Sequence, residues 1–366
     1  MIVDDHIMDN TTYVLVDVPL MDTNVSGLNN SSVDQLPFYN FVHGLYLYVI
    51  PLISILGIIG NVCSFKVFVC STFSRHPSSI YLSVLSVSDT WFLLALFLGW
   101  LGSLDVRFSE SGALCMVSVY VTYITSFLSV WYVVLVMFER YIVVCHPLRA
   151  PSLCSKKRSG IATGIITAFA ILFYAHSFFT MEIVINHTGK RTSACQMIDD
   201  DINLIAVITY VDSTITFIIP FIAIFTLNVL VIRAIRSFTY RHVSRHEKKY
   251  YSPSHNTLSK AQMRLTVMLM VVSIVFLVLN LPSHGVRFYI AVNNLIYNPN
   301  ITLFLTQQVC QILYYANFAV NFIVYVSTSK TFRRSLREPN KCGTLSFVSC
   351  SSAMINLQTR QENTGI

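Results

Sequence analysis

Charged residues are scarce in this chain of 366 residues. Only 12% of the residues are Asp, Glu, Lys or Arg, whereas 54% are hydrophobic. A soluble globular domain carries about 25% charged residues, so this chain has too little polar sequence to cover an apolar core in water. The composition therefore excludes an ordinary soluble domain and favours a protein whose surface faces lipid.

Signatures of catalysis are also missing. The sequence contains no HExxH zinc motif, no GxSxG nucleophile motif and no phosphate-binding loop, the short patterns whose spacing serves hydrolysis or phosphoryl transfer. Internal repeats, on which many transporter folds are built, are not evident. These absences predict a membrane protein that is not an enzyme, needs no cofactor and has no nucleic-acid partner.

The first residues lack the features of a cleavable signal peptide. They read MIVDDHIMDN, without the basic start and the apolar run that such a peptide needs. We therefore expect the first apolar segment to act as the insertion signal.

Long apolar runs are what the sequence does have. Seven runs approach the roughly 20 residues that a helix needs to cross a bilayer. They span residues 42–70, 80–101, 114–144, 160–179, 204–232, 265–292 and 301–326. The predicted fold is an all-α integral membrane protein, a seven-transmembrane helix bundle. Its expected domains are a tail at 1–41, a bundle at 42–328, and a cytoplasmic region at 329–366.

The distribution of basic residues predicts the orientation of the bundle, because cytoplasmic loops are enriched in Lys and Arg. With the amino terminus outside, 21 of the 25 basic residues lie on the cytoplasmic side. All Asn-x-Ser/Thr triplets then lie outside, where glycosylation occurs, although such triplets also arise by chance. Their acceptors are Asn10, Asn24, Asn29, Asn30, Asn186 and Asn300. The sequence thus predicts a multi-pass plasma-membrane protein with an extracellular, glycosylated N-terminal tail.

Two of the nine cysteines stand apart from the rest. Cys115 and Cys195 alone lie in or beside the predicted outer loops, the oxidising side of the membrane. We infer a disulfide between them.

An acid and a base stand side by side in "LVMFERYIVVCHPLR". Glu139 and Arg140 follow an almost wholly apolar run, although a charge at the centre of a bilayer costs about 2.5 to 3.5 kcal/mol. A helix from Cys115 to Arg140 would be about 37 Å long, so the pair should lie at the cytoplasmic mouth. There it either has a function, or Arg140 extends to the lipid headgroups.

These features together resemble the rhodopsin family of G-protein-coupled receptors. The resemblance covers about residues 42–340, with seven apolar segments and "ERY" at the end of the third. Further motifs fall in order along the chain. They are Gly60 and Asn61, "LSVSD" ending at Asp89, Cys115 with Cys195, "ERYIVVCHPL", Pro220, "FLVLNLP" with Phe276 and Pro282, and "NFIVY" at 321–325.

The resemblance implies a switch for G-protein coupling. Arg140 would be held near Glu139 at rest and would engage a Gα subunit once the sixth helix moves outward. Tyr325 would turn inward to support it, and Tyr141 and Asn321 complete the motif residues. The implied partners are a heterotrimeric G protein, an arrestin and a receptor kinase.

A buried acid in the second helix resembles the sodium site of the family. Asp89, with Ser129, Asn317 and Asn321, would offer one carboxylate and neutral oxygens, ligands that suit a hard cation. The alternative is a protonated Asp89 that is only hydrogen-bonded. Sodium is the only metal that the resemblance suggests.

The segment after the seventh helix, "SKTFRRSL" at 329–336, has the pattern of a short amphipathic eighth helix on membrane lipid. Cys342 and Cys350 follow it and are either palmitoylated or free thiols.

Several positions depart from the family pattern. Asn280 replaces a customary tryptophan of the sixth helix, and Asn228 replaces a tyrosine of the fifth. Phe322 replaces a proline of the seventh helix, and Gln262 stands where some members carry an acid that pins the arginine. The inner parts of the switch are therefore expected to be altered.

The ligand class follows from the outer half of the bundle. Thr122 stands where amine receptors carry aspartate, and "VINHTGKRTSACQMIDDD" predicts a β-hairpin with a turn at Thr188 and Gly189, typical of peptide receptors. Acidic residues outnumber basic residues in the predicted outer segments, and this excess of negative charge would attract a cationic ligand. The enrichment of Lys and Arg in cytoplasmic loops is an alternative explanation, because it also leaves few bases outside. The predicted pocket comprises Thr122, Tyr123, Ser126, Asp212, Asn280, His284, Arg287, Gln307, Gln311 and Tyr315.

We therefore predict a receptor for an extracellular neuropeptide or peptide hormone, of a divergent, invertebrate-like type. A chemosensory or small-molecule receptor of the same fold is the alternative, and a channel or transporter is a more distant one. Asp212 and Arg287 leave two interpretations open: they pair with each other, or one or both face the ligand, since charges inside a membrane are functional candidates.

Overall fold

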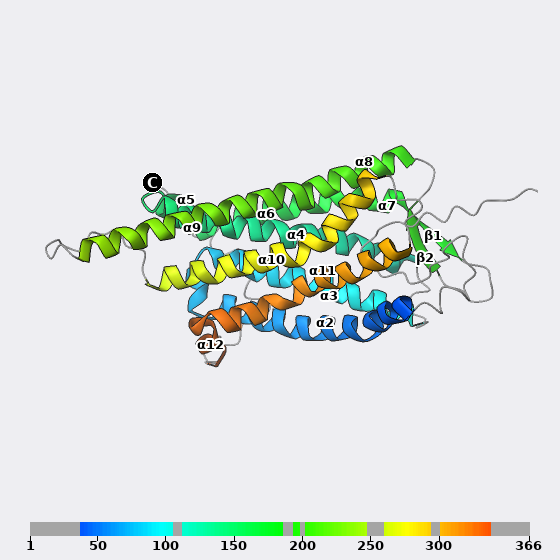
Figure 1. Cartoon of the computed structure of the whole chain (residues 1–366), viewed down its shortest axis with the longest axis horizontal. Coiled ribbons are helices and arrows are strands. Elements are labelled where there is room, and N and C mark those ends of the chain that lie inside the picture. The colour runs from blue at the N-terminus through cyan, green and yellow to red at the C-terminus, as the bar shows by residue number, and fades with distance from the viewer. Residues whose placement is uncertain are drawn as a thin grey trace, which may run out of the picture.

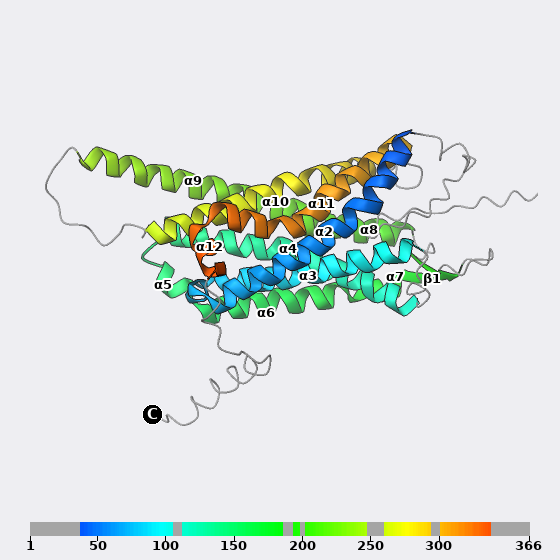
Figure 2. The same ribbon diagram turned by 90° about the horizontal axis from the view of Figure 1, so that it is seen from below.

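Helices make up most of the computed structural model, which describes residues 37–104, 112–185, 193–197, 202–246, 260–293 and 301–337. Within these ranges, seven helices are long and apolar enough to cross a membrane. They lie side by side in one elongated bundle (Figure 1, Figure 2). The prediction of a seven-helix membrane bundle is confirmed.

The spans of the bundle agree with the predicted apolar runs to within several residues at most ends. The first helix begins earlier than expected, at Pro37 rather than at residue 42. The bundle helices are α2 (Pro37–Cys70), α3 (Ser78–Ser103), α4 (Gly112–Cys145), α6 (Lys156–Phe173), α8 (Ile202–Ser213), α9 (Ile219–His246), α10 (Lys260–Val292) and α11 (Ile301–Thr328). A π-helical turn, η5 (Thr214–Ile218), joins α8 to α9, so these two form the fifth span.

The two ends of the bundle carry different short elements. At one end lie η1 (Thr72–Arg75), α5 (Ala150–Leu153) and α12 (Lys330–Arg337); we call it the α12 end. At the other, the β end, η3 (Tyr174–His176) and α7 (Ser177–Thr180) lead into β1 (Met181–Ile185), as Figure 1 shows. There β1 pairs antiparallel with β2 (Ser193–Met197), with Ile183 opposite Cys195. The predicted turn at Thr188 and Gly189 lies outside the described residues.

Two glycines of α2 permit close packing of the bundle. A Cβ atom at Gly57 would lie 2.5 Å from Leu93 Cδ1 and 2.7 Å from Ala319 Cβ, and one at Gly60 would lie 2.9 Å from Phe322 Cβ. Small residues let membrane helices approach in this way. The close approach explains the glycine of the "GN" motif, since α2 contacts both α3 and α11 here.

The short helix α12 packs by a single aromatic side chain. Phe332 is fully buried, with its ring centroid 5.7 Å from that of Phe68 and 5.5 Å from that of Tyr325. Arg333 Nη1 donates to the carbonyl oxygen of Val326 at 2.5 Å, which satisfies a group at the end of α11 that has no partner within its own helix. The helix begins and ends one residue later than the predicted 329–336.

Candidate functional site

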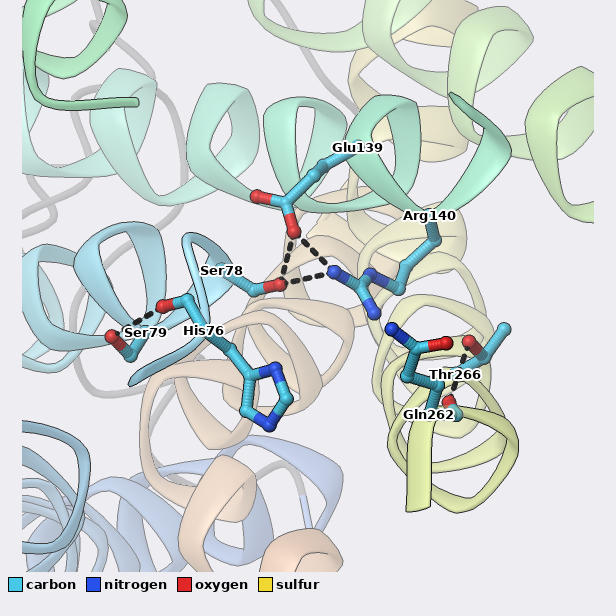
Figure 3. A network of polar contacts seen from close by, with 7 residues as sticks. All are labelled: His76, Ser78, Ser79, Glu139, Arg140, Gln262 and Thr266. Carbon is cyan, nitrogen blue, oxygen red and sulfur yellow. Dashed lines mark hydrogen bonds and ion pairs between the residues drawn. The ribbon is translucent and has the colours of Figure 1, made fainter. Parts of the chain in front are cut away.

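The pair Glu139–Arg140 lies near the α12 end of α4. Both side chains are almost fully buried, and they form an ion pair. Ser78, at the start of α3, donates to Glu139 Oε1 at 2.5 Å and accepts a hydrogen bond from Arg140 Nη2 at 2.6 Å (Figure 3). The resting contact between the acid and the base is therefore present, and a serine of a neighbouring helix bridges it.

The cluster around Arg140 is not fully satisfied. Glu139 Oε2 and Arg140 Nε are buried without a hydrogen-bond partner among the described residues. A buried polar atom without a partner costs about 1 to 3 kcal/mol. The arrangement therefore carries a penalty that a new partner for Arg140 would relieve.

Gln262 of α10 lies on the side of the guanidinium away from Glu139 (Figure 3). An amide can contribute a neutral hydrogen bond there but not an ion pair. In the part of the chain that the structure describes, Arg140 is ion-paired only with Glu139, within its own helix. No salt bridge of Arg140 therefore holds α10 in place.

His76 precedes α3 beside this cluster (Figure 3). Burial, the positive charge of Arg140 and, to a smaller extent, that of Lys156 lower the pKa of His76 below its ordinary value, although Glu139 acts in the opposite direction. The imidazole is therefore neutral at pH 7 and adds no charge to the cluster.

Two further residues of the predicted switch are tyrosines. The Tyr141 hydroxyl is 3.2 Å from His146 Nε2. Tyr325 is buried with its ring centroid 5.1 Å from that of Phe68, and its hydroxyl has no hydrogen-bond partner among the described residues. In this structure, then, neither tyrosine is hydrogen-bonded to Arg140.

Asp89 of α3 sits at the centre of a second polar cluster. Its side chain is fully buried. Ser129 Oγ donates to Oδ1 and Asn321 Nδ2 to Oδ2, each at 2.8 Å. Asn317, one turn before Asn321, is also buried. Hydrogen bonds thus join three of the four predicted sodium ligands, Asp89, Ser129 and Asn321. The fourth, Asn317, lies on α11 with Asn321.

Four polar side chains join α10 to α11 in the half of the bundle nearer the β end. Arg287 Nη2 donates to Gln311 Oε1 at 2.8 Å, and Ser283 Oγ donates to the same oxygen at 2.7 Å. With the amide of Gln307 oriented to satisfy its neighbours, its oxygen accepts from Arg287 Nε at 3.1 Å. Two neutral amides therefore clamp the guanidinium. Ser283 was not predicted from the sequence.

Tyr314 links this clamp to the third helix. Its hydroxyl is 2.5 Å from Ser126 Oγ, and the guanidinium carbon of Arg287 lies 5.8 Å from its ring centroid. The ring of His284 packs edge-on against Tyr314 and stacks on Phe217 at 4.6 Å. The predicted residues Ser126, His284 and Arg287 are thus brought together by a tyrosine that the prediction missed.

Asp212 of α8 is held by a different helix. It accepts a hydrogen bond from the Tyr174 hydroxyl at 2.5 Å, and the Tyr174 ring stacks on Tyr123 at 5.6 Å. The structure thus gives each of the two charges at least one neutral polar contact, Asp212 with Tyr174 and Arg287 with Gln311. The two interpretations, that Asp212 and Arg287 pair with each other or that one or both face the ligand, stay predictions.

Three other predicted pocket residues bond or pack differently. Thr122 Oγ1 donates to the carbonyl of Ser118 at 2.8 Å, and Asn280 Nδ2 to that of Phe276 at 2.7 Å, both within their own helices. Tyr315 is buried, and its ring packs against Phe92. The predicted role of these three residues in the pocket stays a prediction, which mutation can test.

Some predicted sites lie outside what the structure describes. They are the side chains of Cys115 and Cys195, the acceptors Asn10, Asn24, Asn29, Asn30, Asn186 and Asn300, and the tail cysteines Cys342 and Cys350. The disulfide, the glycosylation and the palmitoylation therefore stay predictions.

Similarity to known proteins agrees with this arrangement. Residues 60–325 match the family described as 7 transmembrane receptor (rhodopsin family). The thyrotropin-releasing hormone receptor of Ovis aries is 25% identical over 313 residues, 78% of this chain and 75% of that receptor. The FMRFamide receptor of Drosophila melanogaster is 27% identical over 218 residues, 56% of this chain and 36% of that receptor. The neuromedin U receptor homolog nmur-2 of Caenorhabditis elegans is 33% identical over 129 residues, 33% of this chain and 30% of that protein.

Proposed function

Because the chain belongs to the rhodopsin family of seven-transmembrane receptors, we propose that it binds a neuropeptide or peptide hormone and activates a heterotrimeric G protein. One observation carries this proposal: a single bundle holds a clamped arginine near the β end and a buried Glu139–Arg140 pair near the α12 end. Ligand binding at the first site would bias the arrangement at the second.

Three features support a peptide ligand. Similar proteins include receptors named for thyrotropin-releasing hormone and FMRFamide. The β1–β2 pair lies at the β end of the bundle (Figure 1), the half that holds the proposed pocket. Charged, amide and aromatic side chains line the same region, namely Asp212, Arg287, Gln311 and Tyr314. A peptide can engage all three kinds of group, whereas a small apolar ligand would leave the charges unused.

The proposed orientation places the β end outside the cell and the α12 end in the cytoplasm of the plasma membrane. The rule for basic loops supports it, and so do the exposed basic residues Lys330, Arg334 and Arg337 of α12, which suit anionic lipid. Arrestin and a receptor kinase would then meet the receptor at the same face as the G protein.

A peptide screen tests the function. Cells that express the chain should respond to one or more peptides, amidated and cationic ones included, with a change in calcium or cyclic AMP. Cells that express Arg140→Ala serve as the matched control. Sodium flux or substrate uptake in proteoliposomes, without any G-protein response, would instead favour the channel or transporter alternative.

The disulfide gives a prediction of its own. Because β2 carries Cys195 and α4 carries Cys115, the bond would fasten the β1–β2 pair to the third span. Loss of a native disulfide typically costs about 2 to 5 kcal/mol. Cys195→Ser should therefore abolish surface expression or agonist binding, measured by surface labelling and radioligand binding. Cys154→Ser, which changes a free thiol near the α12 end, is the control, and wild-type binding by Cys195→Ser would contradict the bond.

The donor set around Asp89 fits a sodium ion. A buried carboxylate with no ion-pair partner among the described residues needs either a cation or a proton, because an isolated charge is costly to bury. Asp89, Ser129 and Asn317 would offer a carboxylate, a hydroxyl and an amide oxygen, which are hard ligands. Asn321 would add a second amide oxygen by rotating its amide, whose nitrogen donates to Asp89 in this structure. We propose that sodium binds them as an allosteric ion.

Sodium dependence distinguishes the ion from the proton. The wild-type receptor should melt at a higher temperature in sodium chloride than in N-methylglucamine chloride at equal ionic strength, since a ligand of the folded state stabilises it. Asp89→Asn should abolish that difference, and Ser86→Ala, which removes a buried hydroxyl bonded only within α3, should retain it. Equal melting temperatures for the wild type in both salts would favour a protonated Asp89.

A further inference from the structure

Cys70, the last residue of α2, is disulfide-bonded. Four of the other cysteines are free thiols, namely Cys63, Cys145, Cys154 and Cys310. The candidates that remain as its partner are Cys115, Cys195, Cys342 and Cys350. The proposed orientation places Cys70 in the cytoplasm, where disulfides are rare and, when present, are usually transient and catalytic or redox-sensing.

The position of Cys70 excludes the two cysteines of the β end. Cys115 lies in the first turn of α4 and Cys195 in β2, whereas Cys70 leads into η1 at the α12 end. The helix from Cys115 to Arg140, which is near the α12 end, is about 37 Å long. A disulfide joins Cα atoms only about 4.4 to 6.8 Å apart. The partner of Cys70 is therefore a cysteine of the tail.

Aromatic contacts hold α12 beside Cys70. Phe68 and Phe73, which lie on either side of Cys70 in the chain, are buried. Their ring centroids lie 5.7 Å and 6.3 Å from that of Phe332 of α12. Ser71 Oγ accepts a hydrogen bond from the backbone nitrogen of Phe73 at 3.2 Å, which fixes the turn that follows Cys70. The tail therefore starts close to Cys70.

The length of chain after α12 favours Cys342 over Cys350. The helix ends at Arg337, and the five residues from there to Cys342 extend to at most about 17 Å. Returning from Arg337 to the level of Phe332 covers only about 7.5 Å of helical rise. Pro339 disfavours helix at the residue before it, so the chain can leave the axis of α12. Cys350 would close a longer loop, at a greater entropic cost.

We propose that Cys70 and Cys342 form a redox-sensitive disulfide that ties the tail to the cytoplasmic end of the first span. The oxidant is a peroxide. The sulfur of one thiol attacks an oxygen of hydrogen peroxide, the O–O bond breaks, and a sulfenic acid and water result. The second thiol then attacks the sulfenic sulfur, so that the S–S bond forms, the S–O bond breaks and a second water leaves. Cytosolic thiols reverse the reaction by thiol–disulfide exchange.

The surroundings of Cys70 suit this chemistry. Its side chain is half-buried, so a small peroxide can reach the sulfur, while the contacts of Phe332 keep the second thiol within reach. Because one sulfur atom cannot carry both a disulfide and a thioester, oxidation would also exclude palmitoylation of Cys342. The sensing role rests on the proposed function and its orientation, since on the oxidising outer side the bond would be permanent.

Cleavage of the chain between the fifth and sixth spans tests the bond directly. A protease recognition sequence is inserted between α9 and α10 of the full-length receptor. Free thiols are blocked with N-ethylmaleimide before the membranes are cleaved. The first fragment carries Cys70 and the second carries Cys342, so only a disulfide between the fragments holds them together on a non-reducing gel. Fragments from peroxide-treated cells should stay joined, and dithiothreitol should separate them.

Four serine variants identify the two cysteines. Cys70→Ser and Cys342→Ser should each lose the joined species completely. Cys63→Ser on α2 and Cys350→Ser in the tail are the matched controls, and both should keep it. Separate fragments from the peroxide-treated wild type would overturn the bond, and this comparison needs no substitution that could harm folding. Joined fragments in Cys342→Ser would overturn the choice of partner.

The same membranes separate the disulfide from the proposed function. Joined fragments without nucleotide exchange on any Gα subtype would retain the disulfide and contradict G-protein coupling, and exchange by a wild type whose fragments separate would do the reverse. A bond that is complete in untreated cells, where the cytosol keeps thiols reduced, would overturn the sensing role. A bond that appears only after peroxide supports it.

Discussion

Arg140→Ala should bind agonist with nearly wild-type affinity and lose agonist-stimulated nucleotide exchange to the level of untransfected membranes. The guanidinium lies near the α12 end, far along the bundle from the Arg287 clamp, so its loss should not disturb the proposed pocket. It is ion-paired with Glu139, and the proposed function assigns it to contact with the Gα subunit. Radioligand binding and nucleotide exchange on the same membranes measure the two effects separately.

Two further variants give this prediction its controls. Glu139→Gln should raise basal exchange, because the arginine loses its ion pair. Ser78→Ala should raise it less, since it removes one neutral bridge and leaves the ion pair in place. If Arg140→Ala exchanges nucleotide normally, the buried Glu139–Arg140 pair has a structural role only.

The position of Arg140 could be predicted from the sequence, but the bridge by Ser78 could not. Helical rise from Cys115 locates Arg140 along the third span, and this needs no knowledge of its neighbours. Ser78 lies 61 residues from Glu139 along the chain, so the contact depends on how α3 packs against α4. The hydrogen bond from Ser273 of α10 to Asn228 of α9 could not be predicted for the same reason, because the two residues lie 45 positions apart.

The pocket shows a smaller failure of the sequence analysis. The prediction named Tyr315, whereas the adjacent Tyr314 contacts Ser126 and lies beneath Arg287. Tyr314 and Tyr315 lie three and four residues after Gln311, and both spacings place a residue on the same face of a helix. Both rings also pack against Phe92. Helical spacing alone therefore could not select Tyr314.

Asp212 and Arg287 each form a hydrogen bond with a neutral group of a neighbouring helix, Asp212 with Tyr174 and Arg287 with Gln311. The sequence could not predict either contact, because both depend on how the helices pack. A neutral group fixes the direction of a charged side chain without cancelling its charge, which suits a role in ligand binding.

Arg287→Ala should reach the surface yet lose agonist potency by tenfold or more, about 1.4 kcal/mol of binding free energy. Folding should survive because Ser283 Oγ still donates to Gln311 Oε1 and so keeps α10 bonded to α11. Concentration–response curves at matched surface expression measure the effect.

Arg287→Lys and a charge swap decide how the arginine acts. Lysine keeps the positive charge but lacks the planar guanidinium that the amides of Gln311 and Gln307 hold. The agonist potency at Arg287→Lys should therefore lie between those at the wild type and at Arg287→Ala. Asp212→Arg with Arg287→Asp should not restore potency, since on the ligand-facing interpretation each charge contacts the ligand separately. Recovery of potency by the swap would show that the pair forms when ligand binds, and unchanged potency in both single variants would remove the two residues from the pocket.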